Sequence, residues 1–222
     1  MKIEAVTVCV DYSHYLKKVI SNKNKLDRWV IVTHRSDKDT IKLCKKENIE
    51  FVLSKKIFKK AKFAKGKAIN EGLNILEKKD WILHLDADQL LPENFREITK
   101  QTCTDETKLY GCRRFKTTEE PMPGLKLVKK CPVSGINKVY ILHLPIGFFQ
   151  LWHSSICTKY PSVSKNTLHD DWIFLSNWRK HGDKWIDFKK RFEILDLKLI
   201  DVCGCWGSKS GHINGIRNLK QK

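Results

Sequence analysis

Residues 81–95 read WILHLDADQLLPENF and place two aspartates directly after an apolar run. That run has the length and composition of a strand buried on both faces, and Pro92 with Glu93 predicts the first turn of a helix. Asp86 and Asp88 would then follow the carboxyl end of a strand, which is where open α/β sheets bind ligands. Because two carboxylates on one turn can reach the same hard divalent cation, the stretch predicts a metal site at a sheet edge.

The segments before this stretch alternate between strand-like and helix-like patterns. Strands are predicted at residues 3–10, 29–33 and 51–53, and helices at about 13–20 and 37–47. Alternation of this kind is typical of βαβ units and predicts a largely parallel sheet. A further helix follows within residues 59–80, with apolar residues at helical spacing and small residues, among them Gly72, that allow close approach to the sheet.

The second half of the chain carries weaker patterns. The predicted elements are a helix at about 93–100, strands near 109–115, 139–144 and 194–202, and a helix that opens at residue 169. A loop rich in Pro, Gly and charge is expected at 117–130. Since no repeat or linker divides the 222 residues, the sequence predicts one α/β domain with a Rossmann-like, mostly parallel central sheet flanked by helices.

The composition excludes several classes of protein. Hydrophobic residues make up 41% of the chain and aromatic residues 10%, which argues against a disordered protein. No apolar run reaches the roughly 18 residues of a membrane span, so a soluble protein without a transmembrane segment is expected. The motifs of P-loop ATPases (GxxxxGK[ST]), serine hydrolases (GxSxG) and zincins (HExxH) are absent from the sequence.

Charge and cysteine content bear on partners and compartment. The net charge of +18 predicts a positive field that attracts polyanions, such as nucleic acid, an anionic membrane surface or phosphorylated substrates. The same lysine excess can also be a solvated surface without a partner. The 8 cysteines are dispersed, with one CxC pair, which favours reduced structural thiols over a zinc site and favours a cytoplasmic location.

A helix motif of the form KGxAxNxG precedes the aspartate turn LDADQ, and its residues are Lys65, Gly66, Ala68, Asn70 and Gly72. This combination resembles the GT-A fold glycosyltransferases, particularly the family 2-like group. The resemblance implies a GT-A fold over residues 1–222, with a nucleotide-sugar-binding half at 1–100 and an acceptor-binding half at 101–222. It also implies transfer of a sugar, hexosyl or pentosyl, from a nucleotide-diphosphate sugar with Mn²⁺ or Mg²⁺, usually with inversion.

The same resemblance assigns donor and metal residues. Asp88 would ligate the metal directly, and Asp86 would bind it through water or hold the nucleoside side of the donor. Lys65 would meet the diphosphate, and the end of the first strand would meet the base or ribose. The residues implied for the donor are Val10, Tyr12, Lys65, Asn70 and Asp86. From the residues alone, Lys65 can also be an exposed helix residue and Asn70 a local hydrogen bonder.

A second acidic pair, Asp170 and Asp171, opens the helix predicted from residue 169. An inverting transferase needs a carboxylate to take the proton of the acceptor hydroxyl, and family 2 enzymes place an acidic pair at a late helix start. Asp171 is therefore predicted as the catalytic base, with Asp170 as the second choice. Because an aspartate before a helix is also a common cap, one of the two is expected to cap while the other does chemistry.

Residues 147–155, GFFQLWHSS, face the acceptor and the sugar in the resemblance. Gln150, Trp152 and His153 are the predicted acceptor contacts, because a flat aromatic surface suits a pyranose face or a stacked base. The aromatic residues of this segment can equally belong to the core.

The tail after residue 203 is glycine-rich and basic. The resemblance offers His212 as a third metal ligand, and Lys209 and Arg217 as phosphate partners. The tail departs from the histidine-leucine-glycine form expected in related viral proteins, and tails of this composition are often disordered ends.

The acceptor follows least directly from the sequence. The positive charge and the absence of a membrane anchor lead to the hypothesis of a virus- or phage-encoded transferase, in the host cytoplasm, that adds sugar to hydroxymethylated bases in DNA. One alternative is a transferase that builds a surface or capsid glycan. Two further alternatives are a non-catalytic, basic nucleic-acid-binding protein that has kept the fold, and a nucleotidyltransferase that releases pyrophosphate.

Overall fold

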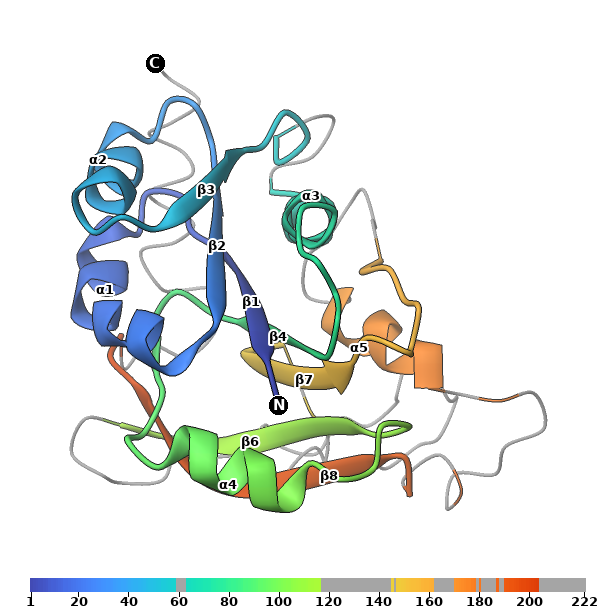
Figure 1. The fold of residues 1–222 in the computed structure, drawn as a ribbon. Coiled ribbons are helices and arrows are strands. Elements are labelled where there is room, and N and C mark those ends of the chain that lie inside the picture. The colour runs from blue at the N-terminus through green and yellow to red at the C-terminus, as the bar shows by residue number, and fades with distance from the viewer. Residues whose placement is uncertain are drawn as a thin grey trace.

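A mixed sheet of eight strands organises the part of the chain that the computed structural model describes, namely residues 1–58, 63–116, 145, 147–161, 170–178, 180, 187 and 190–203 (Figure 1). The strands are β1 (Ile3–Val8), β2 (Arg28–Thr33), β3 (Glu50–Leu53), β4 (Trp81–Leu85), β5 (Gln89–Leu90), β6 (Leu109–Lys116), β7 (Phe149–His153) and β8 (Phe192–Asp201). The helices are α1 (Ser13–Lys18), α2 (Lys38–Lys46), α3 (Lys65–Leu73), α4 (Phe95–Thr102) and α5 (Asp170–Leu175), with 3₁₀ turns η1 (Ile20–Lys25) and η4 (Ser176–Trp178).

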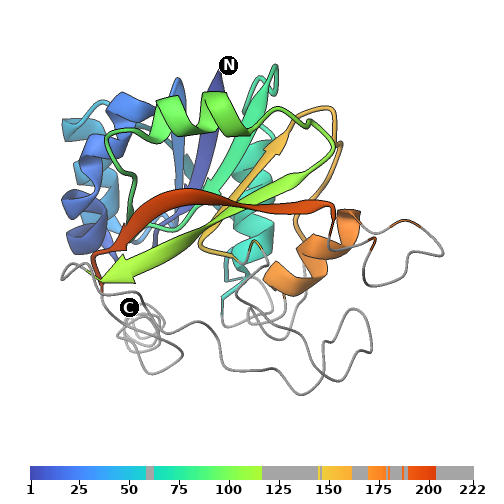
Figure 2. The ribbon, with the colours of Figure 1, turned by 90° about the horizontal axis from the view of Figure 1, so that it is seen from below.

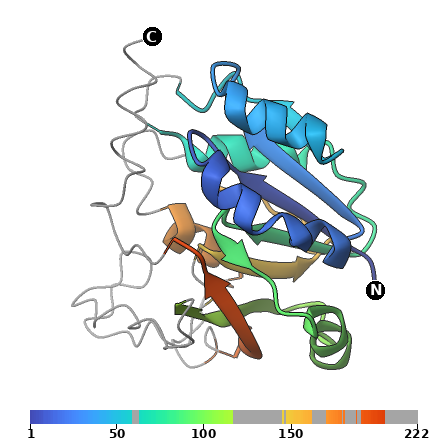
Figure 3. The ribbon, with the colours of Figure 1, turned by 90° about the vertical axis from the view of Figure 1, so that its left-hand side faces the viewer.

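The first half of the sheet is parallel, as the sequence predicts. Strands β3, β2, β1 and β4 lie side by side in that order, and Ala5 of β1 lies opposite both Trp29 of β2 and Leu83 of β4. Every residue of β1 and β4 is buried, because α1 and α4 contribute to the core layer on one face of these strands and α3 contributes to the layer on the other (Figures 1 and 3). Parallel strands need this cover on both faces, and it explains their uninterrupted apolar sequences.

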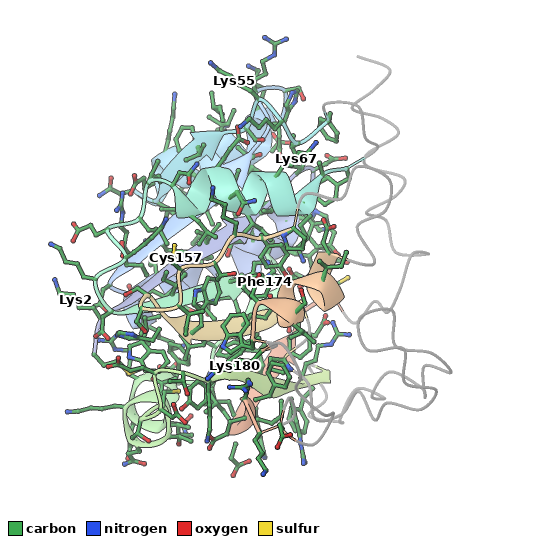
Figure 4. All side chains as sticks on the ribbon, turned by 90° about the vertical axis from the view of Figure 1, so that its right-hand side faces the viewer. Lys2, Lys55, Lys67, Cys157, Phe174 and Lys180 are labelled. Atoms are coloured by element: carbon green, nitrogen blue, oxygen red, sulfur yellow. The ribbon has the colours of Figure 1, made fainter. Side chains whose placement is uncertain are left out.

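The core lies in two layers, one on each face of the sheet. Phe95 of α4 packs in the first layer, together with the buried faces of α1 and α2. Ile69 of α3 and Phe174 of α5 pack in the second, and Figure 4 shows Phe174 between α5 and the sheet. A Cβ atom on Gly72 would lie 2.6 Å from Cγ1 of Val6, so this glycine lets α3 approach the sheet as closely as predicted.

The second half of the sheet is mixed. Strand β7 runs antiparallel to β4, β6 runs antiparallel to β7, and β8 pairs parallel with β6 and antiparallel with β5. Strand β8 therefore lies between β6 and β5, and α4 packs against it (Figure 2). Gln89 of β5 lies opposite Asp201 of β8, so the carboxyl end of β8 reaches the turn that follows β4.

The predicted elements of the first half are confirmed with small shifts at their ends. The side chain of Asp37 caps α2 by accepting a hydrogen bond from the backbone amide of Thr40. The strand predicted at 139–144 and the loop at 117–130 lie outside the described residues. No helix among the described residues is long and apolar enough to cross a membrane.

Candidate active site

Three carboxyl ends of strands meet at one edge of the sheet. Asp86 and Asp88 follow β4, Tyr12 follows β1, and Cys203 follows β8. The aspartate turn is tied to its neighbours by the backbone: the amide of Asp86 donates to the carbonyl of Phe148 at 3.0 Å, and the amide of Val202 donates to the carbonyl of Asp88 at 2.9 Å. The prediction that this turn lies at a sheet edge is therefore confirmed.

Asp86 forms an ion pair with the first residue of α3. Its Oδ1 lies 2.7 Å from Nζ of Lys65, which also donates to the carbonyl of Gly147 at 3.3 Å. Burial raises the pKa of Asp86, but the Lys65 ammonium outweighs burial, so the pKa lies below its usual value. Burial lowers the pKa of Lys65, but the charges of Asp86 and Asp171 raise it. The net result is a Lys65 pKa above its usual value. Both groups of this pair are therefore charged at neutral pH.

His84 lies beneath this pair and is neutral. Its side chain is fully buried, with Nε2 3.6 Å from Oδ1 of Asp86 and Nδ1 3.2 Å from Oε1 of Gln150. Burial, followed by the Lys65 charge, lowers the pKa of His84 to about 4. The imidazole consequently adds no positive charge to the edge.

Asp88 has a different environment from Asp86. Its Oδ1 accepts a hydrogen bond from the side-chain amide of Gln89, with Nε2 at 2.8 Å. Among the described residues Asp88 forms no ion pair. Burial, followed by the charges of Asp86 and Asp201, raises the pKa of Asp88 to about 7. A carboxylate that is crowded by two others gains most from a cation placed beside it.

A group of metal-capable side chains surrounds Asp88. Ligand atoms of Asp88, Asp201 and Cys203 all lie within 4.8 Å of one another. Asp201 is fully buried and pairs with Arg114 at 3.2 Å, while the hydroxyl of Tyr12 donates to Sγ of Cys203 at 2.9 Å. Two carboxylates and a sulfur at this spacing fit one divalent cation. The structure thus groups Asp88 with β8, and it groups Asp86 with Lys65.

The acidic pair at the start of α5 divides in two directions. Asp170 is buried, and its Oδ2 accepts a hydrogen bond from the amide of Gly66, in the first turn of α3, at 3.3 Å. Asp171 accepts a hydrogen bond from the hydroxyl of Tyr160 at 2.6 Å, and its carboxylate lies against Gly147, where any side chain would collide with it. Asp170 therefore satisfies a helix amide, and Asp171 lies against Gly147, the residue whose carbonyl Lys65 contacts.

Tyr160 connects Asp171 to the buried polar residues under the site. Its hydroxyl lies 2.7 Å from Oε1 of Gln150, whose amide donates to the carbonyl of Pro145. The side chain of Asn70 bonds both backbone polar groups of Tyr160. Its Nδ2 donates to the Tyr160 carbonyl at 2.7 Å, and its Oδ1 accepts from the Tyr160 amide at 2.8 Å. In this structure Asn70 and Gln150 hold the residues around the site, and their predicted contacts with donor and acceptor stay predictions.

Two of the predicted acceptor residues do not lie at the site. Trp152 is 1% exposed and packs on Phe174, and it lies opposite Ile82 in the sheet. His153 lies opposite Trp81, at the end of β4 that is remote from the aspartates, and it contacts Asp80 at 3.5 Å. Because β7 runs antiparallel to β4, the chain leaves the site after residue 149, which the segment's composition does not reveal.

The remaining predicted residues are placed as follows. Val10 is buried at the end of β1, and Tyr12 turns its hydroxyl toward Cys203. His212, Lys209 and Arg217 lie outside the described residues.

Four residues of this edge were not found from the sequence: Arg114, Tyr160, Asp201 and Cys203. Asp201 is the last residue of β8 and comes directly after Leu199 and Ile200, and an acid at the carboxyl end of a predicted strand is the signal that could have identified it. Tyr160 and Arg114 carry no such signal, because their positions depend on contacts between distant segments.

Solved structures supply the comparison, since no family model and no curated protein matches the chain. TarS 1–349 of S. aureus in complex with UDP has a TM-score of 0.61 and 12% identity, over 91% of this chain and 60% of that one. Glucosyl-3-phosphoglycerate synthase of Mycobacterium tuberculosis, in complex with Mn²⁺, UDP and glucosyl-3-phosphoglycerate, has a TM-score of 0.58 and 13% identity, over 87% and 68%. Inositol-1-phosphate CTP transferase of T. maritima has a TM-score of 0.51 and 11% identity, over 98% and 96%.

This chain spans about 60% of the length of TarS 1–349. At these identities the likeness concerns the fold, including the curled mixed sheet and the edge at which the strands end. The chain has the GT-A fold that its sequence predicts.

Proposed function

We propose that the chain is a glycosyltransferase that uses a divalent metal, Mn²⁺ or Mg²⁺, to move a sugar from a nucleotide-diphosphate sugar to an acceptor hydroxyl. The observation that carries this proposal is the edge of the sheet, where Asp88 lies in a metal-capable group and the Lys65 ammonium interacts with the charges of both Asp88 and Asp171. The neighbours that contain UDP, in one case with Mn²⁺, support it.

The donor would lie along the ends of β1 and β4. Asp88 and Asp201 would hold the metal, whose role when bound is to neutralise the charge of the departing diphosphate. Lys65, which is paired with Asp86 at 2.7 Å, would contact the diphosphate. Tyr12, at the end of β1, would lie beside the nucleoside.

The acceptor hydroxyl would lie beside Asp171. This carboxylate is oriented by the Tyr160 hydroxyl, whose pKa is raised by burial and by Asp171 itself, so Tyr160 remains a hydrogen-bond donor. An oriented carboxylate can take the proton of the acceptor as it attacks, and attack opposite the leaving diphosphate inverts the sugar carbon. Asp170 is the less suitable base, because it is buried against the amide of Gly66.

The proposed acceptor is anionic, and its first candidate is DNA with hydroxymethylated bases, as a virus- or phage-encoded enzyme would modify. The charge of +18 supports an anionic acceptor, and Lys2, Lys55 and Lys180 are examples of exposed lysines on the face in Figure 4. Two of the similar structures are named as synthases of sugar phosphoglycerates, which are also anionic. A surface or capsid glycan is the alternative acceptor.

A second candidate function is nucleotidyl transfer. The similar CTP transferase matches nearly the full length of both chains, and paired acids on a metal serve that reaction as well. The two reactions differ in their products: nucleotidyl transfer releases pyrophosphate, and glycosyl transfer releases a nucleoside diphosphate. A non-catalytic nucleic-acid-binding protein would release neither.

The decisive experiment incubates the protein with Mn²⁺ and a panel of nucleotide sugars. Each donor is tested with hydroxymethylated DNA, with unmodified DNA, with 3-phosphoglycerate and without acceptor, and both nucleoside diphosphate and pyrophosphate are measured. The Asp88→Asn variant should lose nucleoside diphosphate release, whereas Asp196→Asn, an exposed carboxylate of β8, should retain it. Pyrophosphate release from nucleoside triphosphates would favour the second candidate, and no release with any donor would refute both.

A further inference from the structure

We infer that Cys203 is a metal ligand, so that the cation is held by two carboxylates and one thiolate, Asp88, Asp201 and Cys203. This inference rests on the proposed function only in requiring that a divalent metal binds at the edge of the sheet. It goes beyond that function by naming a sulfur ligand and hence the chemical class of cation that the site prefers.

The pairing of β5 with β8 brings the three ligand atoms together. Gln89 lies opposite Asp201, and the amide of Val202 donates to the carbonyl of Asp88, so the backbone on both sides of the site is hydrogen-bonded. The backbone amide of Cys203 donates to Oδ1 of Asp201 at 3.0 Å, which fixes the backbone of Cys203 beside that carboxylate. The spacing of the ligands is therefore set by the fold.

The sulfur of Cys203 has a partner that suits a ligand. The Tyr12 hydroxyl donates to it at 2.9 Å, and a hydrogen bond donated to sulfur stabilises a thiolate and orients it. The other described cysteines differ. Cys9, Cys44, Cys103 and Cys112 are buried in the core, and Cys157 is exposed. Cys203 is the described cysteine that belongs to the group with the two aspartates.

The charge of the group favours a cation. Arg114 pairs with Asp201 at 3.2 Å, and the side-chain amide of Gln89 donates to Asp88 at 2.8 Å. The sulfur of Cys203 adds a third ligand atom within 4.8 Å of the two carboxylates. A dication would offset the repulsion between these carboxylates, and the sulfur would add a third protein ligand to it.

A sulfur ligand changes which metals bind well. Mg²⁺ prefers oxygen ligands in octahedral geometry, whereas Co²⁺, Zn²⁺ and Cd²⁺ accept mixed oxygen and sulfur ligands. The wild-type protein should therefore bind Co²⁺ and Cd²⁺ more tightly than Mg²⁺, and replacing the sulfur by oxygen should narrow that difference. Loss of the ligand should weaken Co²⁺ binding by roughly tenfold or more.

The experiment is a Co²⁺ titration of the full chain followed by absorbance. The wild-type protein should develop a thiolate-to-cobalt charge-transfer band in the near ultraviolet together with the visible bands of bound Co²⁺. Cys203→Ser should lose the charge-transfer band and bind Co²⁺ more weakly, and Cys157→Ser, an exposed cysteine outside the group, should keep both. In the wild-type protein, Cd²⁺ should protect Cys203 from alkylation, as read by peptide mass spectrometry, which tests the ligand without any substitution.

The outcomes separate this inference from the proposed function. Co²⁺ binding that depends on Asp88 but shows no charge-transfer band overturns the cysteine ligand and leaves the metal-dependent transferase standing. A band that persists in Cys203→Ser but disappears in Cys205→Ser overturns the assignment in favour of the neighbouring thiol. A band that depends on Cys203, without release of nucleoside diphosphate from any donor, supports the inference and refutes the proposed function.

Discussion

The titration of Asp88 makes the candidate metal site measurable without any substrate. Its pKa is raised on folding from the ordinary 3.8 to about 7. A carboxyl group with a raised pKa contributes stability that is complete below the unfolded pKa, and this contribution is lost as the pH rises through the folded pKa. The difference corresponds to about 4 kcal/mol at ~1.4 kcal/mol per pH unit, and solvent contact of the partly exposed side chain reduces it to roughly 1–3 kcal/mol.

The perturbation is Asp88→Asn, which keeps the shape of the side chain and removes its charge. With EDTA present, the free energy of unfolding of the wild-type protein should fall by roughly 1–3 kcal/mol relative to the variant between pH 5 and pH 8. Mn²⁺ at pH 8 should then stabilise the wild-type protein, by about 2.7 kcal/mol at a concentration 100 times its Kd, and should leave the variant unchanged.

The assay is urea denaturation at pH 5, 6, 7 and 8, first with EDTA and then with Mn²⁺. The Asp196→Asn variant serves as the control, because it removes one exposed carboxylate from β8 without touching the edge. If the wild-type and Asp88→Asn proteins show parallel dependence on pH, then Asp88 is not crowded by Asp86 and Asp201, and the electrostatic argument for a cation beside it is wrong.

Three further predictions test the packing and the acceptor side. Gly72→Ala should lower the unfolding free energy by roughly 0.5–2 kcal/mol in urea, because a Cβ would lie 2.6 and 2.7 Å from Val6 and Val32, at an overpacking cost larger than the gain in helix propensity; a stabilised variant would contradict this. Asp171→Asn should lower kcat by roughly 10²- to 10⁴-fold while the KM for the donor changes little, and unchanged turnover would exclude it as the base. Tyr160→Phe should lower kcat by about tenfold and shift its pH profile, whereas the affinity for the donor identified in the nucleotide-sugar panel, measured by calorimetry, should not change.

Much of the fold was predictable because, in its first half, strands and helices that follow one another in the sequence also pack against one another. The apolar runs of β1, β2 and β4 alternate with amphipathic helices, and each strand is buried because the next helix returns across the sheet. The order of the later strands was not predictable in the same way. Strand direction in β7 and the position of β8 depend on pairings between distant segments, and composition carries no information on either.

The same distinction applies to the site. Asp86 and Asp88 were predicted, because an acid after a buried strand is a local pattern, and the division of work between Asp170 and Asp171 was expected from cap preference. The use of both turn aspartates for one cation stays a prediction. The ion pair of Asp86 with Lys65 and the position of Asp201 depend on contacts between distant segments, so the sequence did not reveal them. Trp152 was assigned to the acceptor from its residue type, although its burial depends on the direction of β7.

The position of β8 has a consequence for how the protein matures on the ribosome. This strand is inserted between β6 and β5, although β6 emerges from the ribosome about 80 residues earlier and β5 about a hundred residues earlier. The parallel half of the sheet can form while translation continues. The position between β6 and β5 stays unoccupied until β8 has been synthesised. A chain that ends before residue 192 would therefore lack two of the proposed metal ligands, Asp201 and Cys203, so the proposed metal site forms only after β8 has been made.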